Sequence, residues 1–111
     1  MKRYIPQKGD FVSVPFDPQS GHEQKGRRPA LVVSNTLFND RTGLAIVCPL
    51  TTTDRGYPFH VAVTDNTKVT GFVMVEQVKS LDYNAREAKN IGKASDDLID
   101  EVLSILDACI Y

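Results

Sequence analysis

Two positions in the sequence combine a phosphate-binding side chain with a neighbouring apolar run. Arg28 comes directly before Pro29 and the apolar residues 30–33, and Thr51 comes directly after the apolar residues 44–50. A planar guanidinium can hold two phosphoryl oxygens and stabilise the negative charge that they gain during cleavage. A stiff, β-branched threonine can aim a hydroxyl donor at a further oxygen. Taken alone, Arg28 is more typical of an exposed loop arginine, and Thr51 is equally typical of a turn-capping residue.

The elements that position these residues are predicted to be mostly strands. Turn residues recur every eight to twelve positions, which is typical of a small all-β barrel or sandwich. Strands are expected at residues 11–16, 30–33, 44–50, 59–63, 71–75 and 80–83. The second and third are apolar without alternation, so we expect them to be central and covered on both faces. Pro15 indicates an edge or a bulge in the first strand.

Two helices and one long loop complete the prediction. Residues 35–43 are expected to form a short helical turn closed by Gly43, and residues 95–110 an amphipathic helix with Ser95 as its N-cap. The wide apolar face of the second helix fits either a dimer interface or deeper packing on its own sheet. Residues 17–28 are polar and hold two glycines and a proline, so they form a long loop.

Composition and charge limit the classes of protein. The 111 residues fit a single domain spanning 1–111, and no apolar run approaches a membrane span. Neither a secretory signal nor a Cys/His metal-ligand spacing is present, so we expect a cytoplasmic protein with two buried thiols, Cys48 and Cys109. The formal net charge is −1, but residues 1–93 carry 13 basic and nine acidic side chains, whereas residues 94–111 carry five acidic ones. A basic body joined to an acidic helix permits binding to RNA.

Three motifs follow one another over most of the chain. The first runs from Gly9-Asp10 through Phe16-Asp17-Pro18 and GHEQKG (21–26) to RRPALVVS (27–34); the second is PLTT (49–52) and the third EQVKSLD (76–82). In combination they resemble the MazF/PemK family of toxins from toxin–antitoxin systems. The resemblance implies a mainly β fold, a small SH3-like antiparallel barrel of the CcdB/PemK kind with a C-terminal α-helix, paired as a homodimer.

The resemblance also implies an activity. Members of this family are endoribonucleases that cleave single-stranded messenger RNA at specific sequences without a metal or other cofactor, and so inhibit translation and growth. Arg28 and Thr51 match the family's catalytic arginine and threonine. The implied reaction is attack of the ribose 2′-hydroxyl on the adjacent phosphorus, which leaves a 2′,3′-cyclic phosphate and a 5′-hydroxyl. The implied partners are RNA and an acidic MazE-like antitoxin, with DNA contacted only through the antitoxin.

The general base has three candidates. Arginine holds its proton up to a pKa above about 12, so Arg28 alone is a poor base. The carboxylates of Glu23 and Glu76 are ranked first, and His22 follows, because a histidine in a glycine-bounded loop is usually solvated. PemK-like members carry an arginine where this chain has Met74, which favours the MazF-like scheme.

Single-stranded RNA is recognised by stacking on aromatic rings and by hydrogen bonds to base edges. Groups suited to this lie near the motifs: Phe16, His22, Gln24, Ser34, Asn35, Tyr57, Gln77 and Arg86. Phe16 is also typical of a core residue. The basic residues Arg86, Lys89 and Lys93 fit either phosphate contacts or an ordinary soluble surface ahead of the last helix.

Two alternatives keep the fold without the nuclease. One is a CcdB-like gyrase inhibitor, whose C-terminal tail contains a tryptophan that this chain lacks, since it ends Ala108-Cys109-Ile110-Tyr111. The other is a noncatalytic SH3-like binding module that uses the long basic loop as a peptide clamp.

Overall fold

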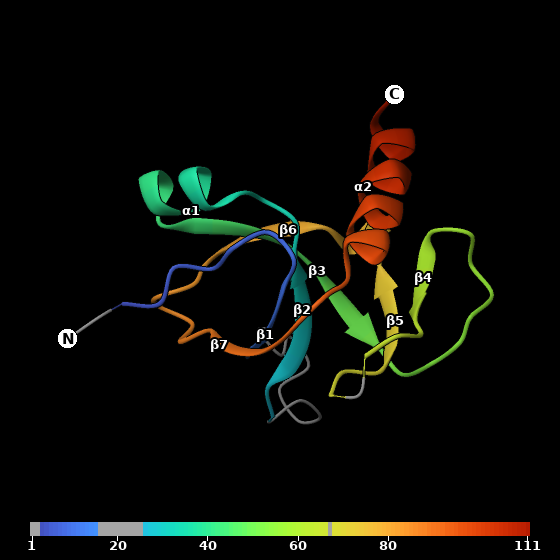
Figure 1. The fold of residues 1–111 in the computed structure, drawn as a ribbon, viewed down its shortest axis with the longest axis horizontal. Helices are drawn as coiled ribbons and strands as arrows, with labels where there is room; N and C mark the ends of the chain where they lie inside the picture. Colours follow the sequence, from blue (N-terminus) through green and yellow to red (C-terminus); the bar gives the residue numbers. More distant parts are fainter. Residues whose placement is uncertain (1–2, 16–25, 67) are drawn as a thin grey trace.

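The fold is a curved antiparallel sheet flanked by two helices. The computed structural model describes residues 3–15, 26–66 and 68–111. Along the chain the elements are β1 (Asp10–Val14), β2 (Arg28–Val32), α1 (Thr36–Thr42), β3 (Leu44–Thr51), β4 (His60–Val63), β5 (Gly71–Met74), the 3₁₀ turn η1 (Val75–Gln77), β6 (Lys79–Asp82), β7 (Lys89–Lys93) and α2 (Asp96–Ile110). Figure 1 shows α2 beside β5 and α1 at the other end of the long strand β3.

The strands follow the order β4-β5-β3-β2-β1-β7, with β6 pairing the first half of β3, and each of these pairs is antiparallel. In the part of the chain described, β4 and β7 end this order without pairing with each other, so the sheet is barrel-like but not closed. The predicted mainly β architecture with a C-terminal helix is confirmed. No helix among these residues is long and apolar enough to cross a membrane.

Strands β2 and β3 are central and apolar on both faces, as predicted. Alternate residues of a strand point to opposite faces, so each strand contributes to two apolar clusters. The inner cluster joins β1, β2, β3 and β5 to α2 and includes Phe11, Leu31, Cys48, Leu50, Val73 and Val102. The outer cluster, on the opposite face, includes Val12, Ala30, Val32, Val47, Leu81 and Tyr83. The sheet therefore separates two hydrophobic cores, one on each of its faces.

Both predicted helices are confirmed, and their ends have the expected caps. The Asn35 side chain accepts a hydrogen bond from the Phe38 N–H at 2.8 Å, and Gly43 closes α1 in the left-handed conformation. Ser95 accepts from the Leu98 N–H at 3.1 Å, while acidic residues occupy the first turn of α2, where the helix dipole favours them.

The two cysteines differ in exposure. Both are free thiols, and Cys48 is buried, which raises its pKa to about 12 and keeps it protonated. Cys109 is exposed, so its predicted burial is wrong. It lies in the last turns of α2, where Ile110 is 67% exposed, whereas Leu98, Ile99 and Val102 in the first turns are buried.

One local prediction needs correction and another needs an addition. The basic stretch before the last helix is exposed at Lys89 and Lys93, but it also has a structural role, because Lys89–Lys93 form β7 and pair with β1. Consequently β1 lies between two strands, and Pro15 follows its end rather than marking a sheet edge. The register between β1 and β7 does shift between Phe11 and Val12, but the extra residue, Ile91, belongs to β7.

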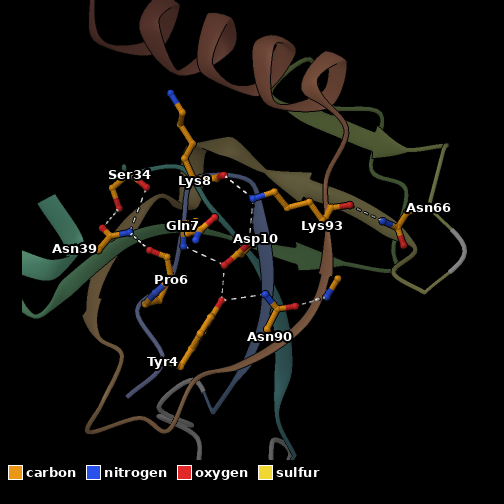
Figure 2. Close-up of polar contacts among 11 residues, drawn as sticks. Tyr4, Pro6, Gln7, Lys8, Asp10, Ser34, Asn39, Asn66, Asn90 and Lys93 are labelled. Carbon is orange, nitrogen blue, oxygen red and sulfur yellow. Dashed lines mark hydrogen bonds and ion pairs between the residues drawn. The ribbon is translucent and has the colours of Figure 1, made fainter. Parts of the chain in front are cut away.

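A buried carboxylate attaches the first residues of the chain to the sheet (Figure 2). Asp10 accepts hydrogen bonds from the Tyr4 hydroxyl at 2.6 Å and the Gln7 N–H at 3.0 Å, and its other oxygen lies 3.2 Å from the Lys93 ammonium. Burial, followed by the hydrogen bond to Asp10, raises the pKa of the Tyr4 hydroxyl far above its ordinary value. These contacts connect the N-terminal segment, β1 and β7.

A second buried network connects α1 to the N-terminal segment and to β3. The fully buried Asn39 side chain donates to the Pro6 carbonyl at 2.7 Å and accepts from the Ser34 hydroxyl at 2.5 Å. The Ser34 oxygen in turn accepts from the Ile46 N–H at 2.8 Å, and the Tyr83 hydroxyl donates to the Asn39 carbonyl at 2.7 Å. Pro6, Ser34 and Asn39 appear together in Figure 2.

Asn39→Ala is expected to lower the free energy of unfolding by about 2 to 3 kcal/mol, because it leaves the Pro6 carbonyl without its side-chain donor and opens a cavity. Leu37→Ala, on the exposed side of the same helix, is the control and should change it by less than about 0.5 kcal/mol. Urea titration of both variants measures the difference, and equal midpoints would contradict the importance assigned to this network.

Candidate active site

A cleft of about 290 Å³ opens where β2 begins and β3 ends. Its lining residues come from three segments: Arg28, Pro29, Leu50, Thr51, Thr52, Thr53 and Thr70. It therefore contains both of the residues predicted to act on a phosphodiester, together with three further threonines.

Strand register brings Arg28 and Thr51 together. Ala30 pairs with Pro49, and continuing this antiparallel register by two residues places Arg28 opposite Thr51. Side chains directly opposite each other in such a pair lie on the same face with their Cβ atoms about 5 Å apart. Two residues that are far apart in sequence thus line the same cleft.

Side-chain hydrogen bonds hold the backbone next to Arg28 against β1 and against the turn between β6 and β7. The guanidinium of the preceding residue, Arg27, donates to the Ser13 hydroxyl at 3.1 Å, to the Ser13 carbonyl at 2.6 Å and to the Glu87 carbonyl. Arg86, in the same β6–β7 turn as Glu87, donates to the Pro15 carbonyl at 3.0 Å. These contacts fix the start of β2, so the origin of the Arg28 side chain is well defined.

Thr51 both caps a turn and lines the cleft, so the two interpretations of this residue are compatible. Its hydroxyl oxygen accepts a hydrogen bond from the Thr53 N–H at 3.2 Å. That bond uses an oxygen lone pair, so the hydroxyl hydrogen can still be donated to a ligand. The contact also restricts the rotamer of Thr51 and therefore the direction of this donor.

Gly71 allows β5 to approach the backbone of Thr51. Its φ of +118° lies where L side chains are strained, and a Cβ built on it would lie 2.5 Å from the Thr51 carbonyl oxygen. Only glycine fits this contact without moving the end of β3.

A histidine–carboxylate pair lies on the same face of the sheet, beyond the residues that line the cleft. His60 Nε2 is 2.9 Å from Glu76 Oε2, and the Tyr57 ring packs against the imidazole with centroids 5.0 Å apart. Partial burial acts to raise the pKa of Glu76. The hydrogen bond from His60, the residue's own backbone N–H, the charge of His60 and Gln77 outweigh that effect and lower it below the ordinary value. Glu76 is therefore ionised at neutral pH.

The other predicted contact residues are spread over the molecule. Tyr57 and Gln77 are exposed and lie near the His60–Glu76 pair, and Arg86 lies near the start of β2. Asn35 and the buried Ser34 lie beyond the opposite end of β2, about 20 Å along an extended chain from Arg28. The side chain of Ser34 is occupied inside the fold and that of Asn35 caps α1.

Four predicted site residues, Phe16, His22, Glu23 and Gln24, lie outside the residues that the structure describes. Among the described residues, no three His, Cys, Asp or Glu side chains gather as metal ligands.

The sequence alone does not indicate that His60, Gly71 or Arg27 belongs to the site. His60 is predicted only as part of a strand, because no local pattern connects it to Glu76, sixteen residues later. Gly71 is a glycine at the start of a strand, which by itself indicates close backbone approach or a bulge. Arg27 precedes Arg28, which the motif favours as the site residue. The oxygen atoms that Arg27 contacts, in Ser13 and Glu87, are distant from it in the sequence.

Gly71→Ala is expected to lower the free energy of unfolding by about 2 kcal/mol or more, because the new methyl group meets the Thr51 carbonyl and the backbone is strained. Gly56→Ala is the matched control, since Gly56 also has a positive φ, of +67°, but a methyl group added there would meet no atom within 4 Å. Thermal or urea unfolding compares the two. Equal losses would mean that the close approach to Thr51 adds nothing to the cost of the backbone conformation.

Known proteins with similar sequences and structures match most of this chain. Residues 7–110 match the family described as PemK-like, MazF-like toxin of type II toxin–antitoxin systems. The chain is 41% identical to the endoribonuclease toxin MazF of Escherichia coli K12, over 83% of this chain and 82% of that protein. It is 42% identical to the endoribonuclease toxin ChpB of the same strain, over 94% of this chain and 93% of that protein.

Solved structures agree with the sequence comparison. A crystal structure of MazE–MazF from Deinococcus radiodurans superposes with a TM-score of 0.88 at 41% identity, covering 97% of each chain. A crystal structure of MazF from the same organism gives a TM-score of 0.86 at 41% identity and covers 97% of this chain and 98% of the other. With matches in sequence and in fold over nearly its whole length, the chain belongs to the PemK-like, MazF-like family of toxins of type II toxin–antitoxin systems.

Proposed function

We propose that the protein is an endoribonuclease toxin that cuts single-stranded RNA in the cleft between Arg28 and Thr51. The observation that carries this proposal is that both side chains line one cleft, at the ends of two paired strands. Relatives at 41% and 42% identity are named endoribonucleases, which supports the same activity here. Cleavage of messenger RNA in the cytoplasm would stop translation and growth.

The proposed reaction uses the RNA's own 2′-hydroxyl as nucleophile. Its oxygen loses its proton and attacks the adjacent phosphorus, and the bond to the 5′-oxygen of the next nucleotide breaks. That 5′-oxygen takes up a proton from solvent, so the products are a 2′,3′-cyclic phosphate and a 5′-hydroxyl. The Arg28 guanidinium neutralises the phosphoryl oxygens as they gain charge, and the Thr51 hydroxyl donates to one of them. Since the substrate supplies the nucleophile and the protein the positive charge, the proposal includes no metal ion.

The proton of the 2′-hydroxyl requires an acceptor other than arginine. We assign this role to Glu23, which precedes Arg28 by five residues in the sequence, because Glu76 is not among the residues that line the cleft. For the same reason, Glu76 is proposed to contact a neighbouring part of the RNA and not the reacting atoms.

Arg28→Ala is expected to lower kcat/KM for a defined RNA by about 100-fold to 1,000-fold, because one charged donor to the transition state is lost. Arg28→Lys should recover only part of this, since an ammonium cannot form two parallel hydrogen bonds. Arg41→Ala, which removes a charge from the last turn of α1, is the control and should retain activity.

The measurement is cleavage of a labelled oligonucleotide with EDTA present, with the product ends identified by mass spectrometry. Intact RNA under the wild-type protein would reject the nuclease, and loss of activity with EDTA would reject the metal-free reaction.

The second proposed partner is an acidic antitoxin segment that competes with RNA for the cleft. Relatives are found as MazE–MazF complexes, and carboxylates can take the place of phosphates beside a guanidinium. A homodimer, with the RNA groove across the two subunits, is part of the same proposal.

The cognate acidic segment is expected to displace a fluorescent, non-cleavable RNA from the wild-type protein, with an apparent affinity that falls as salt rises. Arg28→Ala should weaken the binding of both ligands. Anisotropy titration measures this competition, and simultaneous binding of RNA and antitoxin would contradict a shared site.

A further inference from the structure

His60 is almost completely buried, yet its partner Glu76 reaches the surface. The side chain of His60 is 3% exposed and that of Glu76 is 31% exposed, and the two are joined at 2.9 Å. An ionised carboxylate can only accept, so the shared proton belongs to Nε2 of His60. This fixes the tautomer or charge state of the ring and the orientation of the carboxylate.

The other ring nitrogen is not satisfied. Nδ1 of His60 is buried and has no hydrogen-bond partner among the described residues. Leaving a buried polar atom without a partner lowers the stability of the folded protein. Local costs of this kind are typical of functional sites, because a residue kept for stability alone would be apolar or fully paired. The Glu76 carboxylate, which His60 orients, is therefore a candidate functional group.

The pair shares a face of the sheet with the catalytic cleft. Leu50, Val61 and Val73 point into the inner core, so Thr51, His60 and Met74 point to the opposite face. Thr51 is opposite Phe72 on β5, and His60 is opposite Met74, two residues further on. The pair is thus displaced from Thr51 by two strand spacings, about 10 Å, and by about 7 Å along the strands.

This position fits a nucleotide next to the scissile one. The Tyr57 ring, 51% exposed, offers a stacking surface directly beside the imidazole. The Glu76 carboxylate has lone pairs beyond the one that His60 uses, so it can accept from the N–H groups of a base edge. A ring beside an acceptor is the combination that recognises unstacked bases in single-stranded RNA.

We propose that His60 is a positioning residue that orients the Glu76 carboxylate to read an exocyclic amino group on a base beside the scissile phosphate. Adenine, cytosine and guanine carry such a group and uracil does not, so this position of the RNA discriminates against uracil. The inference rests on the proposed RNA substrate but not on the cleavage step itself.

The test uses short RNAs with one mapped cleavage step, in which each neighbouring base is varied in turn. The wild-type protein is expected to show one position where uracil lowers kcat/KM by about tenfold, mainly through KM. His60→Leu should lose this preference, while His60→Gln, which retains an N–H donor toward Glu76, should recover part of it. The double variant His60→Leu with Glu76→Gln should show the same preference as Glu76→Gln alone, because both substitutions affect the one contact between Glu76 and the base.

Two further readouts separate a positioning role from a structural one. His60→Leu should keep or raise the free energy of unfolding, because it removes the unsatisfied nitrogen. In the wild-type protein, the preference against uracil should disappear at acidic pH, when Glu76 takes up a proton. Because the pKa of Glu76 is lowered, this loss should occur at a pH below the ordinary pKa of a carboxyl group. Thr64→Ala, just after β4, is the control and should leave preference and stability unchanged.

Binding of the same oligonucleotides with a 2′-deoxy sugar at the scissile step makes the test independent of cleavage. Failure to cleave together with a preference in binding that His60→Leu removes would reject the nuclease but support this inference. Normal cleavage with an unchanged preference in His60→Leu would overturn the inference and leave the nuclease intact. A loss of stability in His60→Leu without a change of preference would also overturn it, since His60 would then be structural.

Discussion

The antiparallel register between β2 and β3 is the constraint on which the candidate site depends. A shift of one residue would turn Arg28 or Thr51 to the other face of the sheet, where the inner core and α2 lie. Burial on both faces prevents such a shift, because apolar residues of both strands fill two separate cores. The site is thus positioned by packing that takes place several residues away from it.

The same arrangement separates the opposite charges of the molecule. The acidic residues 94–111 belong almost entirely to α2, which packs on the inner face. Arg28 and Thr51 point to the outer face, and Arg27 and Arg86 contact backbone oxygens near the start of β2. The sheet therefore lies between the five acidic side chains of α2 and the cleft that Arg28 lines, although the formal net charge of the chain is −1.

Sequence patterns predict those strands and helix ends whose conformation is determined by their own local sequence. The apolar runs of β2 and β3, the Asn35 and Ser95 caps and the Gly43 terminus each carry enough local information to define a strand or a helix end. Strand β7 cannot be predicted in this way because Lys89–Lys93 are mostly polar, and its strand conformation depends on pairing with β1. The roles of Ser34 and His60 are hidden for the same reason: their partners, Asn39, Ile46 and Glu76, become neighbours only in the folded sheet. The family's motifs predict Arg28 and Thr51 as site residues, whereas the residues that support them can be found only from coordinates.

The central place of β1 links the two ends of the polypeptide during synthesis. β1 precedes β7 in the chain but pairs with it, and Asp10 meets Lys93, so one edge of β1 stays open until β7 has been synthesised. Contacts between such distant residues carry a large loop-closure entropy and slow the final folding step. A chain that stops before residue 89 therefore leaves one edge of β1 without a partner strand.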